Sequence, residues 1–124
     1  MNWPRTHWWI GTVTLVVFLL SGAYMRWVAH VPALADITRS VYRSRHLFIL
    51  LAALANLALS AGPQPTTRIQ RVISTLVSIA PVFLLTAFWV EPAEGIEAAP
   101  WSQLGLYMLF GAAALLAIGK RPRA

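Results

Sequence analysis

Long apolar stretches, separated by short polar segments, make up most of this sequence. A helix needs about 20 apolar residues to cross the roughly 30 Å hydrocarbon core of a bilayer, and of the four stretches only the second is clearly shorter. They cover residues 8–28, 46–61, 72–90 and 101–118. Arg26 is the only charged residue within them. The pattern therefore predicts an all-α fold, an integral membrane four-helix bundle that forms a single transmembrane domain over residues 1–124.

A different pattern fills the connection between the first two stretches. Leu34, Ile37 and Val41 recur at spacings of three and four residues, with charged and hydroxyl side chains between them. That period is typical of a helix with one apolar face. We therefore expect a short amphipathic helix at the bilayer surface, between the first and second spans.

Tryptophan residues mark the ends of the predicted spans. None of the six falls in the middle of a span. One end of the predicted bundle has Trp3, Trp8 and Trp9, and the other has Trp27, Trp89 and Trp101. Because tryptophan is enriched at both interfaces of a bilayer, these two groups support the same four spans.

Polar and small residues inside the spans indicate how the helices pack. Asn56 lies within the second span, where an amide usually forms a hydrogen bond with a neighbouring helix. Pro81 is expected to kink the third span. Ala113 and Ala117 are small residues four positions apart in the last span, a spacing that allows close contact with another helix.

The charge distribution predicts the topology. The formal net charge is +6, from ten basic and four acidic residues. Four spans place both termini on one side, which then holds six of the ten basic residues and none of the four acidic ones. Loops rich in arginine and lysine stay in the cytoplasm, so we expect both termini there, as for a multi-pass protein of a bacterial inner membrane.

Charges of both signs gather on the opposite, non-cytoplasmic side. In a helix, Arg39, Arg43 and His46 share one face, because their spacings are four and three residues. Three glutamates follow the third span on the same side of the predicted bundle: Glu91, Glu94 and Glu97. Since the forked guanidinium group binds carboxylates well, we expect structural ion pairs between the arginines of the first connection and these glutamates.

The same cluster is also a candidate ligand site. The candidates for binding an anion or another ligand are Arg39, Tyr42, Arg43 and Arg45. His30 ends the first span and His46 begins the second, so antiparallel neighbours would place the two rings at similar depth. Two facing histidines are suitable axial ligands for haem b, whose propionates the arginines could bind. A quinone or a lipid phosphate at the same arginines is the alternative.

Little else in the sequence carries chemistry. The chain has no cysteine, which excludes disulfides and thiolate metal sites. His7 lies among tryptophans and is expected to be an interfacial side chain. No spacing of histidines and acids predicts a metal site, and no motif surrounds a nucleophile, so we assign no catalytic residue and do not expect an enzyme.

These observations lead to two functional hypotheses. The first is a small non-enzymatic membrane protein, an accessory or structural subunit that packs in a homo-oligomer or a larger membrane complex. The alternative is an electron-transfer membrane protein that binds haem b, a quinone or a lipid through His30, His46 and the arginines. Its partners are the lipid bilayer and other membrane proteins. Nucleic acid is not expected, because the topology accounts for the basic excess.

Overall fold

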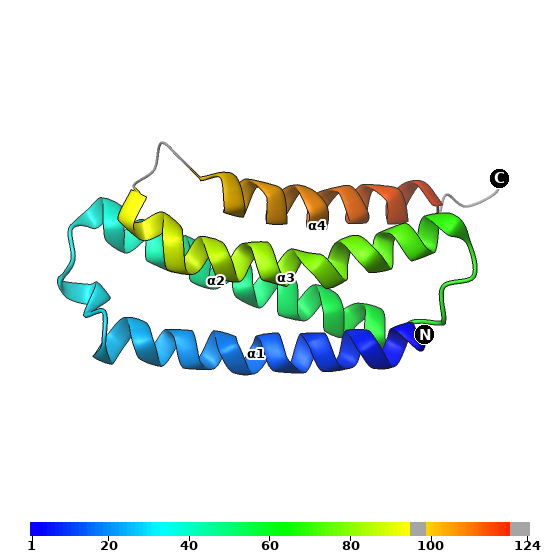
Figure 1. Cartoon of the computed structure of the whole chain (residues 1–124), viewed down its shortest axis with the longest axis horizontal. Coiled ribbons are helices and arrows are strands. Elements are labelled where there is room, and N and C mark those ends of the chain that lie inside the picture. Colours follow the sequence, from blue (N-terminus) through cyan, green and yellow to red (C-terminus); the bar gives the residue numbers. More distant parts are fainter. Residues whose placement is uncertain (95–98, 120–124) are drawn as a thin grey trace.

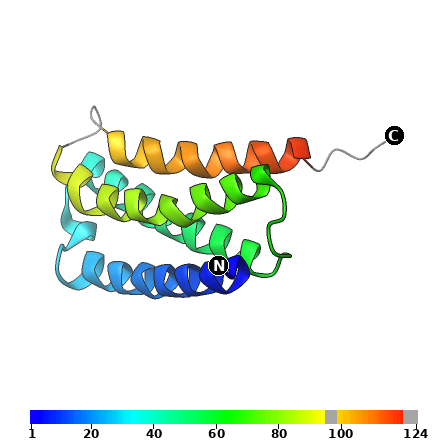
Figure 2. The same cartoon turned by 45° about the vertical axis from the view of Figure 1, so that its right-hand side comes forward.

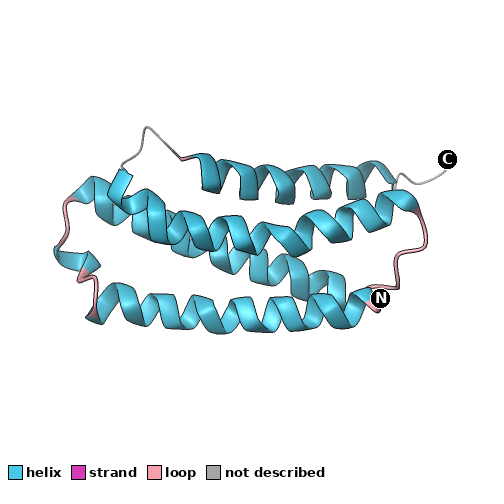
Figure 3. Ribbon diagram, in the orientation of Figure 1, coloured by secondary structure: helices cyan, strands magenta, loops and turns pink. Residues whose placement is uncertain are grey.

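The described part of the chain, residues 1–94 and 99–119 of a computed structural model, is built from helices (Figure 3). The elements are α1 (Trp3–Trp27), the 3₁₀ helix η1 (Val31–Ala33), α2 (Asp36–Ser60), α3 (Arg68–Glu94) and α4 (Pro100–Gly119). The prediction of an all-α fold with four long helices is confirmed. Glu97 and the basic residues after Gly119 lie outside the described residues.

The four helices run antiparallel in sequence order, so α1 begins and α4 ends at the same end of the bundle (Figure 1). The largest helix contacts are those of α1 with α2 and of α3 with α4, and α2 also packs on α3. As a result, α1 and α4 lie on opposite sides of the α2–α3 pair in both views (Figures 1 and 2). α4 meets α2 over only a small area. The bundle is therefore open along the line between α2 and α4.

Three of the helices, α1, α3 and α4, are long and apolar enough to cross a membrane. α2 matches the 25-residue length of α1, but its first turns are polar. The predicted second span is thus the apolar second part of α2. α3 continues through both Pro81 and Pro92.

The amphipathic segment before the second span does not form a separate surface helix. It is the beginning of α2, which runs without interruption from Asp36 to Ser60. No proline or glycine interrupts residues 36–60, so nothing ends the helix between its polar and apolar parts. The helical conformation of the chain is interrupted earlier, at His30, which directly precedes η1 and has a left-handed φ of 49°. Of the three apolar residues of the segment, Val41 is buried in the bundle, Leu34 is partly buried and Ile37 is exposed.

Glycines set the closest helix contacts. A Cβ atom at Gly11 would lie 2.7 Å from Cγ of Leu57, which brings α1 directly against α2. A Cβ atom at Gly105 would lie 2.6 Å from Cγ of Leu84, which does the same for α4 and α3. Ala113, one of the small residues expected at a helix contact, is exposed.

Candidate functional site

A buried ion pair joins the helices at the end of the bundle away from the termini. Glu91 on α3 is fully buried, and its Oε2 accepts a hydrogen bond from Nε of Arg45 on α2 at 2.7 Å. Its Oε1 accepts a hydrogen bond from the backbone N–H of Ser102 on α4 at 2.8 Å. That N–H belongs to the first turn of α4, where the helix supplies no acceptor. Glu91 therefore binds α2 and caps α4 at once.

The other predicted charged residues are not gathered into one site. Arg39 pairs with Asp36 on its own helix and donates to the carbonyl of Pro32 at 3.3 Å. Arg43 and Glu94 are exposed. Tyr42 packs edge-on against Phe88, with ring centroids 5.7 Å apart. Only Arg45 of the three arginines points into the bundle, and Glu91 already neutralises it.

The two histidines proposed as haem ligands lie in different surroundings. Nδ1 of His46 is 3.0 Å from Oγ of Ser21, and its ring stacks on Phe18 at a centroid distance of 4.1 Å. On the other side, Nε2 of His46 would be 3.5 Å from a Cβ atom at Gly22, so α1 covers that nitrogen. His30 is exposed. This geometry gives no support to an iron held between the two rings.

The expectation that His7 is an interfacial side chain is wrong. Its side chain is 1% exposed, and Nδ1 lies 2.8 Å from Oδ1 of Asn56 on α2. α1 begins at Trp3, so His7 falls one turn before Gly11, on the same buried face. The close approach of α2 at Gly11 brings Asn56 within reach. The signal in the sequence was the spacing of His7, Gly11 and Thr14 at four and three residues.

Asn56 fixes the orientation of this network. Its Nδ2 donates to the carbonyl of Ala52 at 3.0 Å and to the carbonyl of Val77 on α3 at 2.9 Å. The predicted hydrogen bond from Asn56 to a neighbouring helix is confirmed. Because both carbonyls only accept, the amide oxygen must face His7, which assigns the ring proton to Nδ1. The His7–Asn56–Val77 network thus links α1, α2 and α3.

The other nitrogen of His7 has no partner among the described residues. Nε2 is buried, without a hydrogen bond. His7 lines a pocket of about 280 Å³, here called the His7 pocket, whose other polar side chains include Gln70 and Ser74. Trp3 also lines it and lies over the imidazole, with ring centroids 5.8 Å apart. A buried acceptor without a donor costs free energy, so this nitrogen needs an explanation.

The N-terminus closes the outer side of the His7 pocket. Oε1 of Gln64, in the connection between α2 and α3, accepts a hydrogen bond from the backbone N–H of Trp3 at 3.0 Å. Nε2 of Gln64 donates to the carbonyl of Met1 at 2.6 Å. Two bonds to one side chain thus hold the first residues of the chain against this connection.

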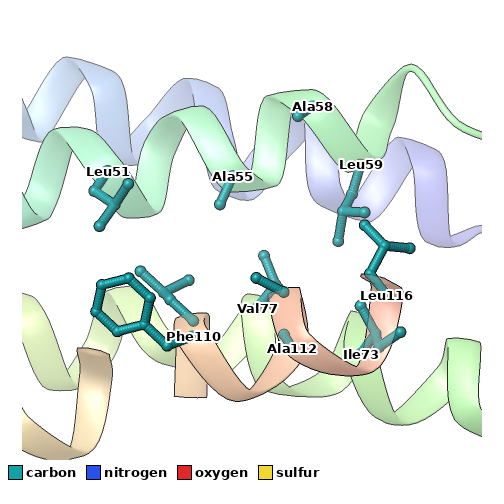
Figure 4. A pocket seen from close by; sticks show the side chains of 11 residues that line it. Leu51, Ala55, Ala58, Leu59, Ile73, Val77, Phe110, Ala112 and Leu116 are labelled. Atoms are coloured by element: carbon teal, nitrogen blue, oxygen red, sulfur yellow. The ribbon is translucent and has the colours of Figure 1, made fainter. Parts of the chain in front are cut away.

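An apolar groove of about 250 Å³ runs between α2 and α4, with α3 as its floor. We call it the α2–α4 groove. Figure 4 shows side chains of α2 such as Leu51 facing Phe110 and Leu116 of α4. Every side chain that lines it is apolar. The groove and the His7 pocket share four lining residues: Ala58, Leu59, Ile73 and Leu116. The two hollows are therefore neighbours, one apolar and the other with polar groups at the end of the bundle.

Comparison of this chain with protein-family models, curated proteins and solved structures finds no match, so its function rests on the geometry of these sites.

Proposed function

We propose that this protein is a small membrane protein that binds an amphiphilic molecule. The apolar tail lies in the α2–α4 groove and the polar head lies in the His7 pocket. The observation that carries this proposal is a pocket lined by His7, whose Nε2 is buried without a partner, next to an entirely apolar groove.

The dimensions support one ligand across both hollows. Pockets for small organic molecules usually measure about 300–1,000 Å³ and are mostly apolar, with a few polar groups that fix orientation. The groove and the pocket, at about 250 and 280 Å³, are each below that range and together fall within it. An apolar tail suits the groove, because every lining side chain is apolar and a tail that fills it gains van der Waals contacts.

The proposal moves the ligand site to the opposite end of the bundle from the predicted one. At the predicted end, Glu91 occupies Arg45 and α1 covers His46. The polar head instead sits at the end where both termini lie. We place that end in the cytoplasm of a bacterial cell, which the excess of arginine and lysine there favours. The role of an accessory or structural subunit stays a prediction, since a binding protein can also belong to a larger complex.

The test is to identify what the protein retains when it is purified in mild detergent. Native mass spectrometry should show one amphiphilic molecule per chain. Ala113 is exposed and lines the groove, so Ala113→Trp fills it and should abolish retention. Ala114 is exposed on the same helix and is not part of the groove lining, so Ala114→Trp is the matched control and should retain the ligand. Equal retention by the two variants, or none by the wild type, would overturn the proposal.

A further inference from the structure

We infer that the headgroup in the His7 pocket carries a hydroxyl group, which donates a hydrogen bond to Nε2 of His7. This inference rests on the proposed function, because it describes the head of the same ligand. It selects hydroxyl-headed amphiphiles, such as a quinol or another long-tailed phenol, over amphiphiles whose heads only accept hydrogen bonds, such as a quinone, an ether or an ester.

The first step is the assignment of the ring proton. The amide of Asn56 is held by the carbonyls of Ala52 and Val77, so its oxygen accepts the hydrogen bond from Nδ1 of His7 at 2.8 Å. If that proton is the only one on the ring, Nε2 has a free lone pair and acts as an acceptor.

The second step is the absence of a counter-charge for a protonated ring. The described acids, Asp36, Glu91 and Glu94, lie at the start of α2 and at the end of α3, away from the chain termini. A buried imidazolium without a carboxylate would be an uncompensated charge, which is strongly unfavourable. The ring is therefore neutral, and the group that completes its hydrogen bonding must be a donor.

The third step is the lining of the pocket. The described residues that line it include no arginine and no lysine. Arg68 and Arg71, the basic residues at the start of α3, are exposed. Arg71 donates a hydrogen bond to the carbonyl of Thr66. Among the described residues, no cation lines the pocket to offset the desolvation of a phosphate or carboxylate head. A neutral hydroxyl head avoids that cost.

Trp3 adds a preference for an aromatic head. Its indole lies beside the imidazole, at an angle of 32° between the ring planes, and forms part of the pocket lining. A phenol ring can pack against this indole while its hydroxyl group reaches Nε2, since aromatic pairs favour offset or tilted contacts. Because Nε2 is buried, a hydroxyl group reaches it only if a side chain beside His7 moves as the head enters.

The experiment compares two probes with the same ring and tail, decylhydroquinone and its dimethyl ether. Only the first can donate a hydrogen bond. Binding to the full chain is followed by native mass spectrometry over a titration of each probe. We expect decylhydroquinone to bind roughly tenfold more tightly, because one hydrogen bond to a buried acceptor contributes about 1–1.5 kcal/mol. His7→Phe should remove this preference and leave the affinity for the ether unchanged.

A second measurement keeps the test decisive if His7→Phe does not fold. In the ¹⁵N spectrum of histidine-labelled wild-type protein, Nε2 of His7 should resonate as an unprotonated nitrogen, assigned by elimination with His30→Gln and His46→Gln. Decylhydroquinone should shift this resonance and the ether should not. A ring protonated at Nε2 in the unliganded protein would overturn the inference.

The outcomes separate the inference from the proposed function. If both probes bind equally and Ala113→Trp blocks both, the amphiphile site stands and the hydroxyl preference is wrong. If neither probe binds to the wild-type protein, both proposals fail. Preferential binding of decan-1-ol over decylhydroquinone would keep the hydroxyl donor and remove the role of Trp3 as an aromatic wall.

Discussion

Removal of the Glu91 carboxylate should destabilise the bundle more than removal of any exposed charged side chain. In Glu91→Ala, Arg45 loses its counter-ion while its side chain is only 13% exposed, and the backbone N–H of Ser102 loses its acceptor. Breaking a buried pair from one side costs about 3–5 kcal/mol, because it leaves an uncompensated charge. That is a large part of the about 5–15 kcal/mol that stabilises a typical domain.

Two further variants separate the contributions at this junction. Glu91→Gln has one amide oxygen, which can accept a hydrogen bond from either the Ser102 N–H or Arg45, so one of the two bonds can remain and we expect a smaller loss of about 1–3 kcal/mol. The double variant Glu91→Leu/Arg45→Met removes both charges. It should be much more stable than the sum of the single losses, because a pair of apolar residues needs no counter-charge.

The assay is unfolding in mixed micelles at rising mole fractions of SDS, followed by circular dichroism. Glu94→Ala is the matched control: Glu94 lies three residues further along the same helix and is exposed, so its loss should cost about 0–1 kcal/mol. The reasoning is refuted if Glu91→Ala unfolds within 1 kcal/mol of Glu94→Ala. It is equally refuted if the double variant is additive to within about 0.5 kcal/mol.

Three other predictions test the packing and the topology. Asn56→Leu should lower the free energy of unfolding by about 1–3 kcal/mol in the same assay, because it leaves the carbonyl of Val77 and Nδ1 of His7 without partners. Gly105→Val should cost about 1–3 kcal/mol, because its side chain overlaps Leu84, whereas Gly111→Val should cost nothing measurable, since a Cβ atom there meets nothing within 4 Å. The chain has no cysteine, so single cysteines placed at residue 2 and after the last residue can be labelled with a membrane-impermeant maleimide. Both cysteines should be protected in intact cells and should react in inverted vesicles. Labelling of either one in intact cells would contradict the topology.

The pattern of apolar stretches predicted the four helices because the membrane leaves few alternatives. Backbone groups in a bilayer must be satisfied within each segment, so an apolar run of the right length becomes a helix. The pattern did not predict that the amphipathic segment belongs to α2. An amphipathic face has the same period whether it covers a lipid surface or the protein, and Val41 covers the protein.

The candidate sites were harder to predict, because they depend on how the helices are rotated against one another. Asn56 could be recognised as a buried hydrogen-bonding residue from its place within an apolar span. Its partner was missed, because His7 lies among tryptophans like an interfacial residue, and its spacing with Gly11 and Thr14 was the only sign of a buried face. Likewise, the charge pattern indicated pairs between arginines and glutamates. Only the packing of α2 on α3 selects Arg45 and Glu91 as a buried pair.

The polar links fasten α2 to α3 at two separate heights. One is the amide of Asn56 on the carbonyl of Val77, and the other is Arg45 on Glu91. Along α2 these anchor points are about 16 Å apart, at 1.5 Å of rise per residue. Together with the buried apolar packing of Ala52 on α3, the two anchors restrict rotation and sliding of one helix against the other. With both anchors in place, α2 and α3 are held together as one unit. A motion that admits a ligand is therefore expected in α1 or α4.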